Sequence, residues 1–446
     1  MPSSMTWPTL ARNAGKSILS ADCRVFATHK LEVPRLTMET DSHRLRYVKD
    51  PSHRLENRVV MRSKIAPRME LTLSVVILLF LTSVAASAAE AVGQVAEVGL
   101  RQVEQYNFSI HILAMLLVGF GFLMVFVRNY GYSATTGTYL VVGAGLPFYL
   151  FLRSTGILSA EAVSPDSIKA LLLAEFACAA ALISMGAILG RVRLYQYALL
   201  AVLAVPAYLL NEWLVLDGGL GITKGFVDAA GSIVIHAFGA YFGLGLAVAL
   251  TSAAQRDLLI ESNEVSDQFS MLGSMVLWIF WPSFCSAVVP PEQMPRTAIN
   301  TILALCGATL VTYLTSLLLR KGRLGCGDMA NAALAGGVAI GATCNQANPL
   351  TAFVIGSVAG AICAAGYAII QPALQKLLRS VDTCGVHNLH GMPGVFGGVT
   401  AIFVVPGIAK AQIAGIVVTV LLAFVTGTIG GYLIKATGSK AAPYED

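Results

Sequence analysis

Residues 228–247, DAAGSIVIHAFGAYFGLGLA, carry one aspartate at the start, one histidine near the middle and otherwise almost only apolar or small side chains. A helix needs about 20 such residues to cross the hydrocarbon of a bilayer. Ten further stretches approach that length, so eleven spans are expected, approximately at residues 108–127, 133–152, 168–189, 194–214, 228–251, 269–288, 297–318, 328–344, 350–371, 385–405 and 411–434. Because only helices satisfy their own backbone groups in lipid, the sequence predicts an all-α, polytopic membrane protein.

The composition argues against a soluble protein. Of the 446 residues, 56% are hydrophobic and 12% are charged, against about 25% charged in soluble domains. Residues 1–70 hold 13 of the 30 Lys and Arg and 7 of the 25 Asp and Glu, so the remainder is nearly neutral and no nucleic-acid partner is expected. Seven of the eight cysteines lie in or beside apolar stretches without CxxC spacing. They are expected to be buried small residues, and neither a metal nor another cofactor is predicted.

The first 89 residues contain two different segments. Residues 1–60 are polar and lack periodicity, which indicates a disordered leader or a start codon assigned too far upstream. From Met61 onward, Arg62, Lys64 and Arg68 precede an apolar run at 71–81 and small residues at 85–89. That order is typical of a secretory signal peptide, here residues 61–89, and an uncleaved first helix is the alternative.

The loop charges predict the orientation of the chain. If the first span begins outside, the inner loops carry eleven Lys and Arg and the outer loops carry five. Basic residues favour the cytoplasmic side. The mature amino terminus is therefore expected outside the cell membrane, and residues 436–446 are expected to be a cytoplasmic tail.

Ionisable side chains within the spans indicate a functional site, because they are costly in lipid. Four stand at membrane depth: Glu175, His236, His387 and His390. Hydrogen-bonded structural histidines are the alternative. Asp228, at the start of its span, is expected to cap free N–H groups of the helix.

Four segments resemble the Rhesus branch of the ammonium transporter superfamily. They are DAAGSIVIHAFGAYFG (228–243), WIFWPSF (278–284), NAALAGGVAIGA (331–342) and DTCGVHNLHGMPG (382–394). The similarity covers residues 105–435 in the family's order, and the signal peptide with eleven spans is similar to the bacterial type. The resemblance implies a homotrimer with one pore in each subunit. It also implies that spans one to five and six to ten form two inverted five-helix repeats, with one last helix after them.

The resemblance also implies roles for particular residues. His236 and His390 match the twin pore histidines of the family; His390 is chosen over His387 because it precedes a glycine and stands eight residues after an aspartate. His387 is then a secondary pore contact. The other matches are the outer gate pair, Phe176 and Phe284, and the acidic residues with a structural or recruitment role, Asp228 and Glu175.

The implied function is passive conduction of ammonia, with carbon dioxide as a second candidate. An apolar pore excludes ammonium because the ion loses its hydration, whereas neutral imidazoles replace some hydrogen bonds of neutral ammonia. Two other classes remain open. Two histidines on separate helices could ligate haem in an electron-transfer protein, and an ion-coupled solute permease would also be polytopic.

Overall fold

The computed structural model describes residues 82–83, 98–158 and 164–446. The predicted leader, residues 1–60, lies outside the described residues. The predicted signal peptide, residues 61–89, also lies outside them apart from residues 82 and 83.

Within the described residues, nine helices are long and apolar enough to cross a membrane. They are Val98–Phe126, which ends in η1 (Met115–Phe120), α2 (Gly121–Leu123) and η2 (Met124–Phe126); α3 (Gly131–Ser154); α4 (Ile168–Ile188); α5 (Leu194–Val215); η3 (Ser232–Ala237) with α6 (Phe238–Leu250); α8 (Glu264–Ser286); η4 (Pro291–Gln293) with α9 (Met294–Leu319); α12 (Pro349–Ala365) with η5 (Gly366–Ile370) and α13 (Gln371–Leu378); and α15 (Ala409–Ala436). They fall on nine of the eleven predicted stretches. The short helix α7 (Ala253–Arg256) lies between α6 and α8.

The other two predicted stretches form shorter helices. Residues 328–344 contain α10 (Cys326–Ala332) and α11 (Ala335–Ile340), separated by a turn, and residues 385–405 contain η6 (His387–Gly391) followed by α14 (Met392–Val404). The small residues of α11 permit a very close approach to α9, since a Cβ atom on Gly336 would lie 2.1 Å from the Ala304 carbonyl oxygen. The all-α, polytopic prediction is confirmed, and the described residues contain no strand.

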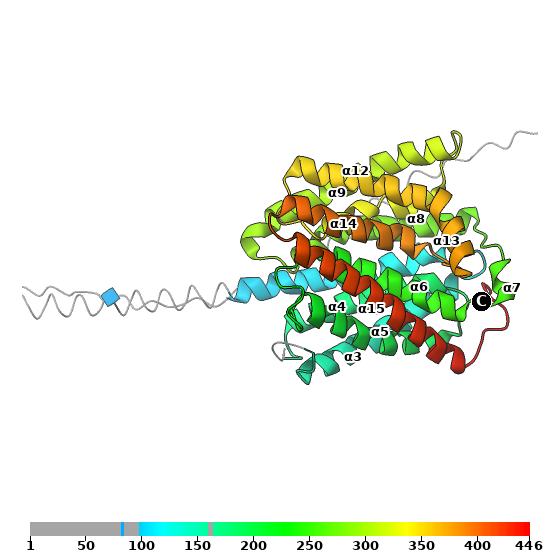
Figure 1. Cartoon of the computed structure of the whole chain (residues 1–446), viewed down its shortest axis with the longest axis horizontal. Coiled ribbons are helices and arrows are strands. Elements are labelled where there is room, and N and C mark those ends of the chain that lie inside the picture. The colour runs from blue at the N-terminus through cyan, green and yellow to red at the C-terminus, as the bar shows by residue number, and fades with distance from the viewer. Residues whose placement is uncertain (1–81, 84–97, 159–163) are drawn as a thin grey trace, which may run out of the picture. The chain divides into compact units, whose positions relative to one another are not determined.

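Glycines determine which helices pack most closely. A Cβ atom on Gly356 of α12 would stand 1.9 Å from the carbonyl oxygen of Ala304 on α9. A Cβ atom on Gly427 of α15 would stand 2.1 Å from the carbonyl oxygen of Phe242 on α6. Figure 1 shows both pairs side by side. Small residues are the usual means by which membrane helices approach one another.

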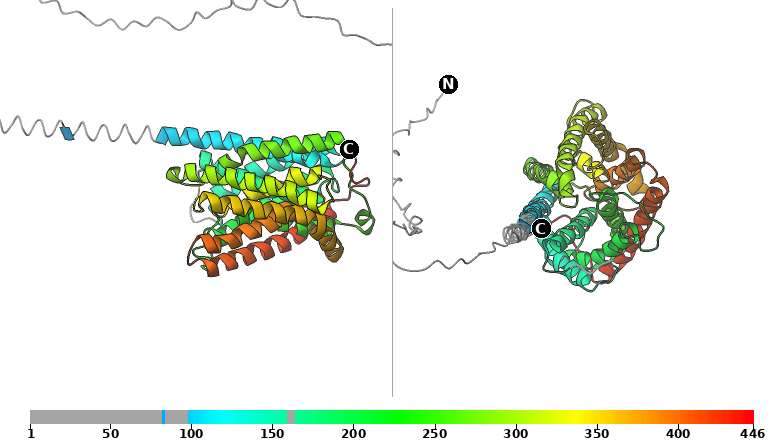
Figure 2. Two further views of the ribbon diagram at one scale, coloured as in Figure 1. Left: turned by 90° about the horizontal axis from the view of Figure 1, so that it is seen from above. Right: turned by 90° about the vertical axis from the view of Figure 1, so that its left-hand side faces the viewer.

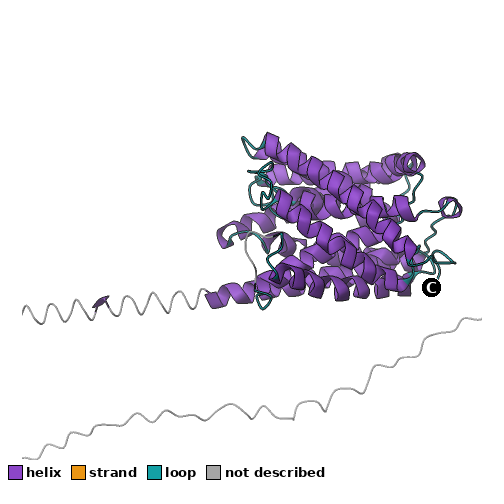
Figure 3. Cartoon of the chain, turned by 60° about the horizontal axis from the view of Figure 1, so that its bottom comes forward, coloured by secondary structure: helices purple, strands orange, loops and turns teal. Residues whose placement is uncertain are grey.

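The long helices run side by side along one direction, as Figure 2 shows from above and nearly end-on. The connecting loops gather at the two ends of these helices (Figure 3). The polar backbone of the loops thus lies outside the depth that the spans would occupy, as a bilayer requires.

Candidate functional site

Two histidines from different parts of the chain meet inside the helix bundle. His236 lies in η3 and His390 in η6, and the two residues are 3% and 4% exposed. Their Nδ1 atoms are 3.2 Å apart, and the rings are nearly parallel, at 12° with centroids 5.3 Å apart. One ring must donate and the other accept, so the contact fits two neutral imidazoles of opposite tautomer.

The same local arrangement positions each histidine. His236 stands eight residues after Asp228, and one carboxylate oxygen of Asp228 accepts hydrogen bonds from the backbone N–H groups of Ile233 and Val234 at 2.9 and 2.8 Å. Gly231 lies between them with φ of +78°, a conformation that glycine adopts without strain. The aspartate therefore caps the π-helix that carries the histidine.

His390 repeats this pattern. It stands eight residues after Asp382, whose two carboxylate oxygens accept from the N–H groups of Val386 and His387, both at 3.0 Å. Gly385 has φ of +67° at the position equivalent to the glycine of the first copy. Both histidines thus follow the sequence Asp-x-x-Gly-x-x-x-x-His and lie on a π-helix.

An aromatic pair closes one side of the histidines. The rings of Phe176 on α4 and Phe284 on α8 meet edge to face with centroids 4.7 Å apart, and the ring of Phe284 lies 5.9 Å from that of His236. Beyond Phe176 is a cavity of about 480 Å³, which we name the vestibule. Asp228 lines it, and the second carboxylate oxygen of that residue has no hydrogen-bond partner among the described residues.

Two buried glutamates, Glu175 and Glu212, have different partners. The Glu175 side chain is fully buried and accepts a hydrogen bond of 2.6 Å from Ser109 on the first helix. Glu212 on α5 lines the vestibule, accepts from Tyr149 at 3.0 Å and pairs with Arg153 at 3.6 Å. Sequence reasoning missed Glu212, although an ionisable residue inside the predicted span 194–214 was a signal that could have found it.

Trp281 is a second residue that sequence reasoning did not identify. Its side chain stacks on His236 with centroids 5.6 Å apart and planes at 25°, and the residue is 2% exposed. The indole Nε1 and the Nε2 of His236 are both buried without a partner among the described residues. Buried polar atoms usually have a partner, so the unpaired Nε2 of His236 is free to bind a small polar molecule.

The opposite side of the histidine pair is tight. The ring of Phe120 stacks on that of His390 with centroids 6.2 Å apart. A cavity of about 20 Å³ beside these two rings would hold about one water. The ring of His387 lies against that of Tyr241, with centroids 5.6 Å apart, and not against the histidine pair.

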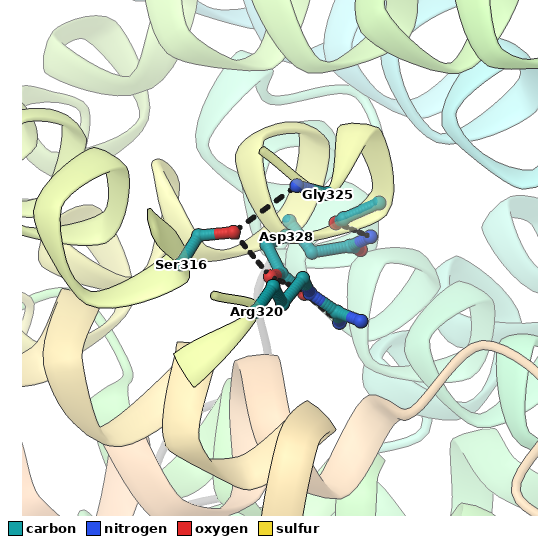
Figure 4. Close-up of polar contacts among 6 residues, drawn as sticks. Ser316, Arg320, Gly325 and Asp328 are labelled. Atoms are coloured by element: carbon teal, nitrogen blue, oxygen red, sulfur yellow. Dashed lines mark hydrogen bonds and ion pairs between the residues drawn. The ribbon is translucent and has the colours of Figure 1, made fainter. Parts of the chain in front are cut away.

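A second, polar cavity of about 340 Å³ follows on the Phe120 side, lined among others by Asp267, Arg320, Asp328, Asn331 and Thr383. Figure 4 shows Arg320 and Ser316 directed at Asp328. The hydrogen bonds are 2.6 Å long, and those that Arg320 donates to Asp328 raise the pKa of Arg320 above its ordinary value. Asp328 is thus neutralised within the protein.

The histidine pair does not fit the haem alternative. Two axial histidines hold an iron and the porphyrin plane between them, whereas these two Nδ1 atoms are already within hydrogen-bonding distance. Among the described residues, no three His, Cys, Asp or Glu side chains are grouped to hold a metal ion.

A bundle of membrane helices with a narrow polar contact between two cavities defines a transport protein that spans the membrane many times. Residues 70–445 match the Ammonium Transporter Family, and the chain belongs to that family. It is a member of the Rhesus branch, a family of channels and not of enzymes.

The relatives include the ammonium transporter Rh type A of Rattus norvegicus, 41% identical over 66% of this chain and 65% of that protein, slightly less than two thirds of its length. The Rh type B transporter of Oryctolagus cuniculus is 39% identical over 75% of this chain and 79% of its own. A solved structure of Nitrosomonas europaea Rh50 has 63% identity and a TM-score of 0.77, over 78% of this chain and 92% of that one. A sensor Amt protein, 19% identical with a TM-score of 0.68 over 77% of this chain and 95% of that one, shares the fold.

Proposed function

We propose that this chain conducts ammonia passively across the cell membrane through a narrow apolar pore. The observation that carries the proposal is the buried contact of 3.2 Å between His236 and His390, which lies between the vestibule and the polar cavity on the Phe120 side. The names of the Rh relatives, ammonium transporters, support the same substrate.

Desolvation decides which species passes. Ammonium would lose hydration worth several kcal/mol in this apolar passage, whereas neutral ammonia loses much less. Ammonium therefore gives its proton to water in the vestibule, ammonia crosses alone, and a proton is taken up again on the other side. The two imidazoles replace part of the hydrogen bonding that ammonia leaves behind.

The proposed roles follow the positions of the side chains. Phe176 and Phe284 gate the vestibule side, and their edge-to-face contact excludes water when closed. Asp228 caps η3 and, with Glu212, places carboxyl groups on the vestibule, whose lining also includes the basic residues Arg101 and Lys169. Glu175 has a structural role through Ser109, and His387 is a lesser contact.

The proposal also includes the topology and the assembly. Counting the broken α10–α11 segment and η6–α14 gives eleven spans, arranged as two inverted five-helix repeats and the last helix α15. The repeated Asp-x-x-Gly-x-x-x-x-His segments at 228–236 and 382–390 support the internal repeat. We further propose a homotrimer, an outer vestibule, a cytoplasmic carboxyl terminus and residues 61–89 as a signal peptide.

Stopped-flow measurement of internal pH in proteoliposomes under an ammonium gradient tests the function. We expect a rapid internal alkalinisation above that of empty liposomes, without a current. A carbon dioxide gradient in parallel tests the second substrate. Flux that needs an ion gradient and saturates would instead support an ion-coupled permease, and no flux above empty liposomes would contradict the proposal.

A further inference from the structure

Arg191 is a buried charge that the proposed pore does not yet use. It lies in the turn between α4 and α5 and is 3% exposed. Its guanidinium donates to the hydroxyls of Thr251 at 2.6 Å and Thr383 at 3.3 Å. It also donates to the carbonyl oxygens of Ala187 and Val381. One side chain thus joins the end of α4, the end of α6 and the segment 381–383.

The segment 381–383 leads directly into the helix that carries His390. The guanidinium bonds to the residue before Asp382 and to the residue after it, and Asp382 caps η6 through Val386 and His387. A shift of this segment would therefore move the cap and, eight residues further, the imidazole of His390.

The charge of Arg191 acts on the same carboxylate. Burial raises the pKa of Asp382 above its ordinary value, and the hydrogen bonds from His387 and Val386 and the positive charge of Arg191 oppose that rise. An ionised carboxylate accepts hydrogen bonds from both N–H groups, whereas a protonated one loses acceptor capacity.

The other histidine segment provides an internal comparison. Residues 229 and 230 donate to the carbonyl oxygens of Ala342 and Gly341, after α11, at 3.3 and 2.7 Å. In the same manner residues 383 and 384 donate to those of Ala187 and Gly186, in α4, both at 3.1 Å. The backbone pairing is therefore repeated, but an arginine bonded to the capping segment occurs only at the second copy among the described residues.

The two aspartates differ accordingly. Asp228 uses one carboxylate oxygen for its cap and leaves the other unpartnered beside the vestibule, whereas Asp382 uses both oxygens. The second copy is thus held through both carboxylate oxygens of its aspartate, and in addition Arg191 bonds to the residues on either side of that aspartate.

We infer that Arg191 is a positioning residue for His390: its guanidinium fixes the segment 381–383 so that Asp382 caps η6 and His390 stays within hydrogen-bonding distance of His236. The inference rests on the proposed function for its effect on ammonia. Its structural part concerns the protein alone.

The test compares Arg191→Gln with Arg193→Gln as a matched control. Arg193 stands two residues later, and its guanidinium bonds to the carbonyl oxygen of Ser439 on the carboxyl-terminal tail. Hydrogen–deuterium exchange is measured for peptides covering residues 380–391 and 228–237, together with ammonia flux. We expect Arg191→Gln to increase exchange in 380–391 but not in 228–237 and to lower the flux about tenfold, the factor that about 1.4 kcal/mol represents.

Two further variants complete the design. Arg191→Lys keeps the charge and covers the case in which the glutamine variant does not fold; it should increase exchange in 380–391 by a smaller factor. In a background of Asp382→Asn, Arg191→Gln should add little, because both act through one cap. Arg193→Gln should leave the exchange of both peptides and the flux unchanged.

The inference would be overturned if Arg191→Gln increased exchange equally in both peptides. It would also be overturned if exchange in 380–391 stayed unchanged in both Arg191→Gln and Arg191→Lys. Fully additive effects with Asp382→Asn would do the same. Failure of the proposed function is distinguishable, since the unsubstituted protein would then conduct no ammonia while the exchange experiment still reports on Arg191.

Discussion

Replacing His236 with alanine removes one half of the buried histidine contact. His390 then loses the partner that lies 3.2 Å from its Nδ1 atom, and the passage keeps one imidazole instead of two. Trp281, which stacks on His236, would also face an empty space where the ring was.

The size of the effect on flux follows from the loss of one hydrogen bond between an imidazole and ammonia in the passage. A hydrogen bond between neutral groups contributes about 0.5–1.5 kcal/mol, which corresponds to roughly a 2- to 13-fold change in rate. His236 and His390 are almost fully buried, so bulk water replaces the missing contact poorly. We therefore expect ammonia flux to fall about tenfold in His236→Ala and by a similar factor in His390→Ala.

Stopped-flow measurement in proteoliposomes, normalised to the amount of folded protein, gives the flux. Electrical recording of the same membranes reports whether ions now leak. His387→Ala is the matched control, since His387 lies one turn from His390 but contacts Tyr241. It should lower the flux less than either of the other substitutions.

If His236→Ala and His390→Ala both conduct ammonia at the rate of the unsubstituted protein and remain impermeable to ions, the assignment of these histidines to the pore is wrong. A loss of folded protein in either variant would be visible as a lower melting temperature and a changed assembly size. Flux is therefore compared only between samples of equal assembly.

Three further predictions concern folding, processing and assembly. Gly356→Ala should destabilise the protein by about 1–3 kcal/mol through overpacking against α9, visible as a lower melting temperature, whereas Gly143→Ala, where a Cβ would meet nothing within 4 Å, should not. Amino-terminal sequencing of membrane-extracted protein should begin near residue 90; a start before residue 71 would contradict the signal peptide. A detergent-corrected mass should match three copies, and a monomer or dimer would count against the trimer.

Hydropathy alone predicted most of the helices. Nine of the eleven stretches coincide with long helices, because a helix needs about 20 apolar residues to cross the hydrocarbon of a bilayer. The same criterion could not predict the turn within 328–344. That segment is buried by the close approach of Gly336 to Ala304, and such a contact depends on a helix distant in sequence.

Some features of the candidate site were also predictable from the sequence, and others depended on tertiary packing. The sequence by itself predicted His236 and His390 as pore residues, because ionisable residues at membrane depth are costly. The matching motifs added the prediction of Phe176 and Phe284. Only the tertiary structure decided which of them touch, that Glu212 rather than Glu175 lines the vestibule, and that Arg191 bonds on both sides of Asp382. Hydrogen bonds and packing act over a few ångströms in space, and residues separated by more than 150 positions come within that range only when the helices have packed.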